Sequence, residues 1–148
     1  MSVRYFEDFA VGQKFGSEPR PIEAAEIKAF AAQFDPQPFH LDEDAARDSL
    51  FGGLAASGWH TAAVTMRLCL SSDVRPAGGI IGGGGELTWS KPVRPGDALR
   101  VEIEVMETRT SRSRPTQGLV KVRIATLNQH GETVQTFSPT LLVERRRL

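Results

Sequence analysis

The sequence predicts an α+β fold in which one buried helix packs against a curved antiparallel sheet. The most apolar window is residues 54–70, and within it residues 57–70 read as a helix that is apolar almost all round, as expected of a helix inside a fold. After residue 78 the periodicity changes, and apolar residues recur at every second position in several runs. Such runs, separated by turns, are typical of antiparallel strands with one covered face.

The N-terminal third is expected to contain a short strand followed by two helices. Residues 9–15 read as a turn that enters the strand, and Pro21 then starts a helix with apolar residues at helical spacing. Pro36 ends this helix because proline lacks the backbone donor that helix continuation needs. A second short helix fits residues 42–48, with Asp42 as its N-cap. Ser57 and Gly58 then open the central helix.

The strands of the sheet are expected as consecutive antiparallel neighbours. Their apolar runs are 87–89, 99–105, 120–124 and 134–143. Turns are predicted at residues 92–97, 111–118 and 128–131. The glycine run 82–85 is not a phosphate-binding loop, because such a loop leads into a helix and this run leads into a strand. A flexible strand entry, or a close backbone approach to a ligand or helix, is the expected role.

The composition points to one ordinary globular domain over residues 1–148. Hydrophobic residues make up 40% and charged residues 24%. Lys plus Arg (18) balances Asp plus Glu (18), which excludes a global field that would recruit nucleic acid or an anionic membrane. The N-terminus lacks a signal pattern and the apolar window is too short to span a bilayer, so a cytoplasmic location is expected.

The sequence indicates neither a metal site nor a bound cofactor. The single cysteine, Cys69, excludes an internal disulfide and lies in an apolar helical stretch, where a buried inert thiol is expected. No trio of His, Cys or acidic residues has zinc-ligand spacing. His60, one turn inside the buried helix, is expected to be a satisfied core histidine and not a ligand.

The candidate site is the segment 34–42, which contains Asp35 and His40 five residues apart. Pro36 and Pro38 stiffen the turn between them, and stiffness helps an acid and an imidazole converge on one water. The alternative is that Asp-Pro is an ordinary helix exit and the histidine is structural.

Three motifs of the chain resemble the MaoC-like (R)-specific enoyl-CoA hydratase/dehydratase family, whose fold is the hot dog. The family pattern runs Asp, any residue, Asn-Pro, an apolar residue, His, any residue, Asp or Glu, and residues 35–42 follow it closely. Residues 56–58 resemble the start of the central helix, which normally reads His-Gly, and residues 92–99 resemble a strand entry. The resemblance covers residues 5–145.

The resemblance implies that Asp35 and His40 are the catalytic pair that holds a water for addition to an enoyl thioester. The N–H of Gly58, in the first turn of a helix, is the implied oxyanion donor, with Ser57 beside it. The alternative is an ordinary N-cap followed by a tolerated glycine. Phe39 and Trp59 are candidate walls of the substrate pocket, and either fits the core equally well.

The chain departs from the family pattern at Gln37, where Asn is usual, and at Ser57, where His is usual. These departures leave a non-catalytic acyl-thioester-binding subunit as one alternative. The other is a hot-dog thioesterase, which usually needs a carboxylate on the central helix, and residues 59–70 contain none.

The family implies an acyl-CoA or acyl-carrier thioester as substrate, and a homodimer or higher even assembly. Bulky residues near the site suggest a short or compact acyl group. They are Phe39, Phe51, Leu54 and Trp59.

Overall fold

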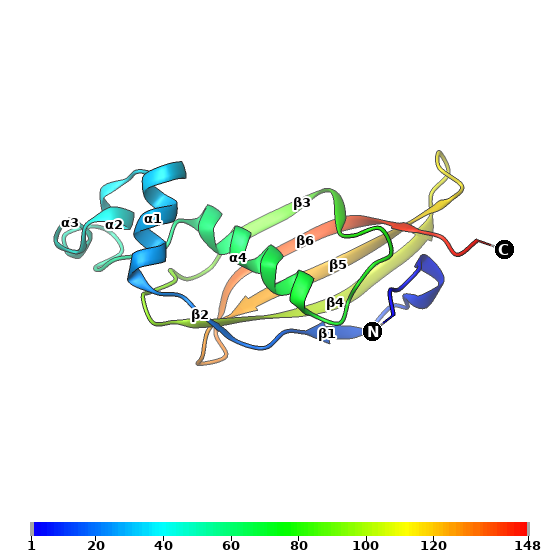
Figure 1. The fold of residues 1–148 in the computed structure, drawn as a ribbon, viewed down its shortest axis with the longest axis horizontal. Helices are drawn as coiled ribbons and strands as arrows, with labels where there is room; N and C mark the ends of the chain where they lie inside the picture. Colours follow the sequence, from blue (N-terminus) through cyan, green and yellow to red (C-terminus); the bar gives the residue numbers. More distant parts are fainter. Residues whose placement is uncertain (1, 148) are drawn as a thin grey trace.

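The computed structural model describes residues 2–147 as an antiparallel sheet with helix α4 lying along one face (Figure 1). The elements in chain order are η1 (Phe6–Asp8), β1 (Lys14–Gly16), β2 (Arg20–Pro21), α1 (Ala24–Phe34), α2 (Pro38–Leu41), α3 (Glu43–Arg47), α4 (Gly58–Ser71), β3 (Ile81–Trp89), β4 (Ala98–Thr110), β5 (Gln117–Leu127) and β6 (Thr133–Glu144). The predicted α+β class is confirmed. Helices α1, α2 and α3 gather at one end of the sheet, and both termini lie towards the other (Figure 1).

The strand order is β1-β4-β5-β6-β3, with β2 paired to β4. Strands β4, β5 and β6 are consecutive neighbours, as predicted. Placing β3 beside β4 was wrong, because β3 pairs with β6 at the opposite edge. The connection over residues 90–97 is therefore a crossover and not a hairpin. It packs against the segment before α4, since Val93 is buried and its carbonyl accepts from Ala56 N–H at 2.9 Å.

Helix α4 begins where predicted, and Ser57 is its N-cap, with the hydroxyl accepting from Trp59 N–H at 3.2 Å. One face of the helix packs on the sheet. The expectation that it is buried all round was wrong, because the sheet covers only one side. Trp59, Met66 and Leu70 are 59%, 37% and 52% exposed.

Helix α1 begins at Ala24 and not at Pro21, which was wrongly expected to start it. Pro21 belongs to the short strand β2, and the neighbouring Ile22 N–H donates to Asp97 O at 2.8 Å. The side chain of Glu26 accepts from Glu23 N–H at 2.8 Å, which satisfies a free donor at the helix start. The predicted end before Pro36 and the Asp42 cap of α3 are confirmed.

The glycine run lies within β3 and not before it. A Cβ on Gly85 would lie 2.5 Å from Ser138 O, so this glycine permits a close approach to the backbone of the neighbouring strand β6, and not to the ligand or helix that was expected. The register between β3 and β6 shifts between Gly82 and Gly85.

Two side chains of α4 were predicted to be buried in the core. Cys69 is buried, and burial raises the pKa of its thiol to about 12, so the thiol is protonated and unreactive at neutral pH. His60 is also buried and stacks on Phe30 with ring centroids 4.7 Å apart. Its Nδ1 has no hydrogen-bond partner within residues 2–147, which corrects the expectation of a satisfied histidine.

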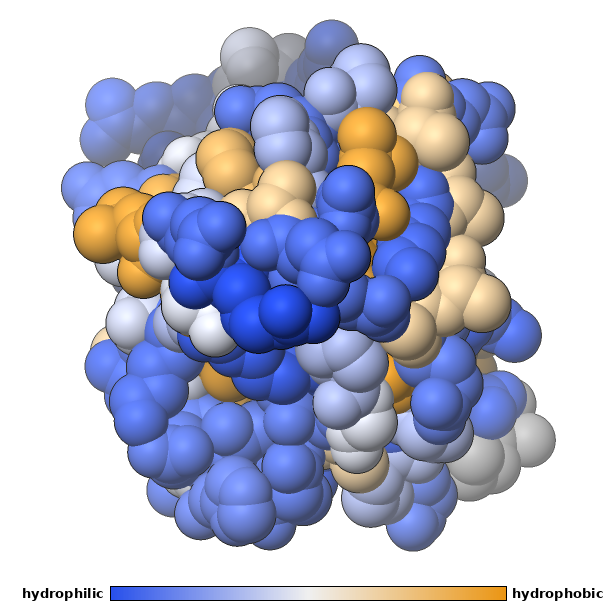
Figure 2. All heavy atoms as spheres, turned by 90° about the vertical axis from the view of Figure 1, so that its left-hand side faces the viewer, coloured by the Kyte–Doolittle hydropathy of each residue, from blue (hydrophilic) through white to orange (hydrophobic). Residues whose placement is uncertain are grey.

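The helical end of the molecule is mainly hydrophilic, with separate hydrophobic patches (Figure 2). Leu50 and Phe34, from the segments at this end, are 99% and 64% exposed. Among the described residues, no helix combines the length and apolar character needed to cross a membrane.

Candidate active site

The segment between α1 and α2 brings Asp35 and His40 together. Asp35 is the C-cap of α1, and its N–H donates to Ala31 O at 2.8 Å. The chain then turns through Gln37, whose N–H donates to Asp35 O at 2.7 Å. Pro38 occupies the first turn of α2, where no backbone donor is needed, and His40 lies within this short helix. The imidazole is therefore carried by a helical turn and not by an open loop.

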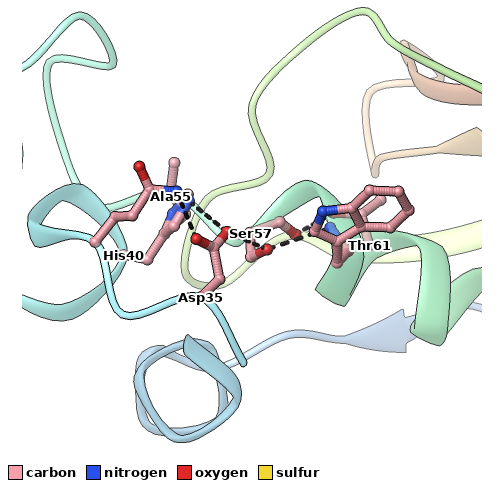
Figure 3. A network of polar contacts seen from close by, with 7 residues as sticks. Asp35, His40, Ala55, Ser57 and Thr61 are labelled. Carbon is pink, nitrogen blue, oxygen red and sulfur yellow. Dashed lines mark hydrogen bonds and ion pairs between the residues drawn. The ribbon is translucent and has the colours of Figure 1, made fainter. Parts of the chain in front are cut away.

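The ring of His40 is fixed in one tautomer by a backbone carbonyl. Its side chain is 6% exposed, and Nδ1 lies 2.6 Å from Ala55 O. Because a carbonyl oxygen only accepts, Nδ1 must carry the proton in this contact. In the neutral ring Nε2 is then an acceptor, and it faces Asp35 Oδ2 at 3.3 Å (Figure 3).

The carboxylate of Asp35 accepts a hydrogen bond at each oxygen. Gln37 Nε2 donates to Oδ1, and the Ser57 hydroxyl donates to Oδ2 at 2.7 Å (Figure 3). Burial alone would raise the pKa of Asp35, but the bonds from Ser57 and Gln37 and the charge of His40 lower it below its usual value. Asp35 is therefore ionised at neutral pH.

The two departures from the family pattern, Gln37 and Ser57, are the two side chains that hold Asp35. The family resemblance placed Ser57 beside the oxyanion donor and gave Gln37 only as a departure from the usual Asn. No sequence signal showed that both would donate to one carboxylate, since Ser57 is 22 residues from Asp35.

The facing atoms of the pair are both acceptors when Asp35 is ionised and His40 is neutral. Two acceptors at 3.3 Å form no hydrogen bond with each other. They can share one proton, or they can both accept from one donor molecule such as water. This arrangement suits proton transfer at a single point.

An open cavity of about 320 Å³ adjoins the pair. Its lining includes Phe39, His40, Phe51, Gly58, Thr61 and Trp89. Asp35 and Ser57 are not part of this lining, and the Asp35 side chain keeps 16% exposure.

Of the bulky residues expected to wall the pocket, Phe39 and Phe51 line this cavity, whereas Leu54 is buried in the core. Trp59 does not line it and packs against Trp89 with ring centroids 5.1 Å apart. Trp89, which sequence reasoning treated only as a strand residue, is the aromatic wall at this side.

Gly58 lies at the cavity wall, in the first turn of α4. The lack of a side chain here is required by Trp89, because a Cβ on Gly58 would lie 2.5 Å from Trp89 Cε2. The indole therefore sits directly over the helix start. Within residues 2–147, no group of three or more His, Cys, Asp or Glu side chains is placed to hold a metal ion.

The helix-and-sheet architecture and this site define a hot-dog protein of the MaoC type. The family model described as "MaoC like domain" matches residues 8–127, and the chain belongs to this family.

Known proteins of similar sequence and structure agree with this assignment. A MaoC-like dehydratase from Rhodospirillum rubrum is 57% identical, with a TM-score of 0.95 over 98% of this chain and 99% of its own. The R-hydratase PhaJ1 from Pseudomonas aeruginosa is 28% identical, with a TM-score of 0.76 over 97% of this chain and 88% of its own. The mesaconyl-CoA hydratase of Haloarcula marismortui is 27% identical over 96% of this chain, which spans 40% of that protein.

Proposed function

We propose that the protein adds water to a 2-enoyl thioester to give the (R)-3-hydroxyacyl thioester, or runs the reverse dehydration. The observation that carries the proposal is the pair of facing acceptors, His40 Nε2 and Asp35 Oδ2, beside a cavity that His40 lines. The hydratases and dehydratase similar to this chain support the reaction class. The thioester is carried by CoA or by an acyl carrier protein.

In the proposed reaction, one water donates its two hydrogens to Asp35 and His40 and turns a lone pair towards C3 of the enoyl group. As the new C3–O bond forms, the water loses a proton to the pair, and the C2–C3 π electrons move onto the thioester as an enolate. The pair returns a proton to C2, so one water is added in total. The Gly58 N–H, at the positive end of the α4 dipole, stabilises the charge on the thioester oxygen.

Crotonyl-CoA distinguishes the three candidate functions. We expect the purified protein to remove the enoyl absorbance without release of free thiol. Thiol release would indicate a thioesterase, and the absence of Asp and Glu from α4 speaks against it. No change in either signal would support the non-catalytic subunit. The two donors on Asp35 oppose that alternative, because they keep the carboxylate in its ionised form.

Ser57 is expected to act as a positioning residue for Asp35. The substitution Ser57→Ala removes the hydrogen bond that most lowers the pKa of Asp35. The base works only when ionised, so activity falls as the pH drops through this pKa. Removing the bond raises the pKa, and the acidic limb of the kcat/KM profile is expected to move to higher pH. The measurement is this profile with crotonyl-CoA.

A matched control is Ser71→Ala, at the other end of α4, where the hydroxyl donates to Leu68 O at 2.8 Å. Its profile should coincide with that of the wild type. An unshifted acidic limb in Ser57→Ala, with reduced kcat, would mean that Ser57 does not act through the ionisation of Asp35.

We also propose that the protein is a homodimer or a higher even assembly. Strand β3 is an edge strand, exposed over almost its whole length, with Ile81 55% and Trp89 43% exposed. The adjoining face of α4 presents Met66 and Leu70. An exposed edge with apolar side chains is suited to pairing with the same edge of a second copy.

Light scattering at micromolar concentration should therefore give at least twice the mass of 16.2 kDa. The substitution Ile81→Lys should shift the protein towards the monomer, because a buried lysine opposes the contact. The control Leu50→Lys, at the helical end, should leave the mass unchanged. A monomeric wild type would contradict the assembly.

A further inference from the structure

The space between α4 and the sheet is crossed by a layer of four polar side chains. The Trp89 indole N–H donates to Gln135 Oε1 at 3.0 Å, and Gln135 Nε2 donates to Thr65 Oγ1 at 3.0 Å. Thr65 Oγ1 and Thr126 Oγ1 are hydrogen-bonded at 2.6 Å. Gln135 and Thr126 are fully buried and Thr65 is 3% exposed. The layer joins α4 to three strands: β3, β5 and β6.

The layer separates two cavities that lie one after the other between α4 and the sheet, along a line called the seam here. On α4, Thr61 lines the reaction cavity, Thr65 belongs to the layer one turn later, and Cys69 lines a second cavity one turn further on. Residues four apart on a helix share a face, so these three follow one line.

Along the strands, too, the residues of the polar layer are followed by residues that line the second, apolar cavity. Alternate strand residues share a face, and Gln135 is followed on its face by Phe137, while Thr126 is preceded on its face by Ile124. Phe137 and Ile124 line the second cavity, which is small, about 40 Å³, and almost entirely apolar.

We propose that this polar layer is the end wall of the acyl pocket and restricts the enzyme to short acyl groups. The inference rests on the proposed hydration of acyl thioesters and names the substrate class for it. An acyl chain that continued along the seam would have to displace the indole of Trp89. It would then leave the polar groups of Gln135 and Thr65 buried against methylene groups, which carries a desolvation penalty.

The position of Trp89 is determined from three sides. Its N–H donates to Gln135, and its ring fills the space that a side chain at position 58 would need. The ring of Trp59 packs on it nearly at right angles, at 86°. Trp89 is thus the specificity-determining residue, and Gln135 positions it. Leu54 and Trp59, which sequence reasoning included among the residues limiting the pocket, do not form its end.

The test compares the binding of butyryl-CoA and octanoyl-CoA by isothermal titration calorimetry, together with the hydration of crotonyl-CoA. The wild type should bind butyryl-CoA at least as tightly as octanoyl-CoA. Trp89→Ala and Gln135→Ala should each shift the ratio of the two affinities towards octanoyl-CoA by at least tenfold, about the factor that one well-placed methylene supplies. The control Gln117→Ala, at the far end of β5, should leave the ratio unchanged.

Binding can be measured even in a variant that has lost turnover. Two substitutions in the wall are compared, so that the test can still be made if one variant does not fold. An unchanged ratio in both folded variants, or tighter binding of octanoyl-CoA than butyryl-CoA by the wild type, would overturn the end wall alone. Failure of the wild type both to bind butyryl-CoA and to hydrate crotonyl-CoA would overturn the proposed function and the wall with it.

Discussion

Replacing Asp35 by Asn is expected to lower kcat/KM for crotonyl-CoA by about 10²–10⁴-fold, the range for loss of one general acid/base group. The amide keeps the shape of the carboxylate but cannot take a proton from water. It also brings an N–H₂ group to a position where both oxygens now accept hydrogen bonds. The fold should persist, because Asp35 lies at a helix end and keeps partial exposure.

The matched control for this substitution is Asp73→Asn, whose exposed side chain follows α4 at the end remote from the site. It should retain wild-type turnover. Thermal melting should be similar in both variants. Near-full activity in a folded Asp35→Asn variant would remove Asp35 from the mechanism.

Replacing His40 by Ala is expected to lower turnover by a similar factor of about 10²–10⁴. The sequence places His40 at a stiff turn, where loss of the side chain would be expected to leave the fold intact. The structure corrects this, because His40 is buried and its Nδ1–H bonds to Ala55 O. The alanine variant leaves that carbonyl without its donor, which costs about 1–3 kcal/mol of stability.

The substitution His40→Asn distinguishes the catalytic effect from the structural one. Its amide N–H₂ can still donate to Ala55 O, whereas no group remains at the position of Nε2. We expect turnover as low as in His40→Ala but a smaller loss in melting temperature. His130→Asn, in an exposed turn, is the control. Wild-type turnover in a folded His40→Asn variant would show that Nε2 takes no part.

The sequence predicted the parts of the fold that local patterns determine. The central helix began at its Ser57 cap, the Asp42 cap began α3, and the alternating runs became β4, β5 and β6. The position of β3 was not predictable in this way. Its pairing with β6 depends on the long-range crossover after Trp89, and alternation within a strand carries no information about its neighbour.

The site was predictable where residues are close in sequence and unpredictable where they are distant. The Asp35–His40 pair follows from a short motif with two prolines. The bond from Ser57 to Asp35 and the place of Trp89 over Gly58 join segments that meet only in the folded chain. The proposed end wall involves Thr65 and Gln135, which look like ordinary polar residues until the register of β3 on β6 is known.

The central claim is that the Asp35–His40 pair directs water to C3 of an enoyl thioester. Its most direct test is incubation of crotonyl-CoA with the wild-type protein in water enriched in ¹⁸O, followed by mass spectrometry of the acyl product. We predict ¹⁸O on C3 of (R)-3-hydroxybutyryl-CoA, with the thioester intact. Label in the carboxylate of free crotonate, or recovery of unlabelled crotonyl-CoA alone, would contradict the account.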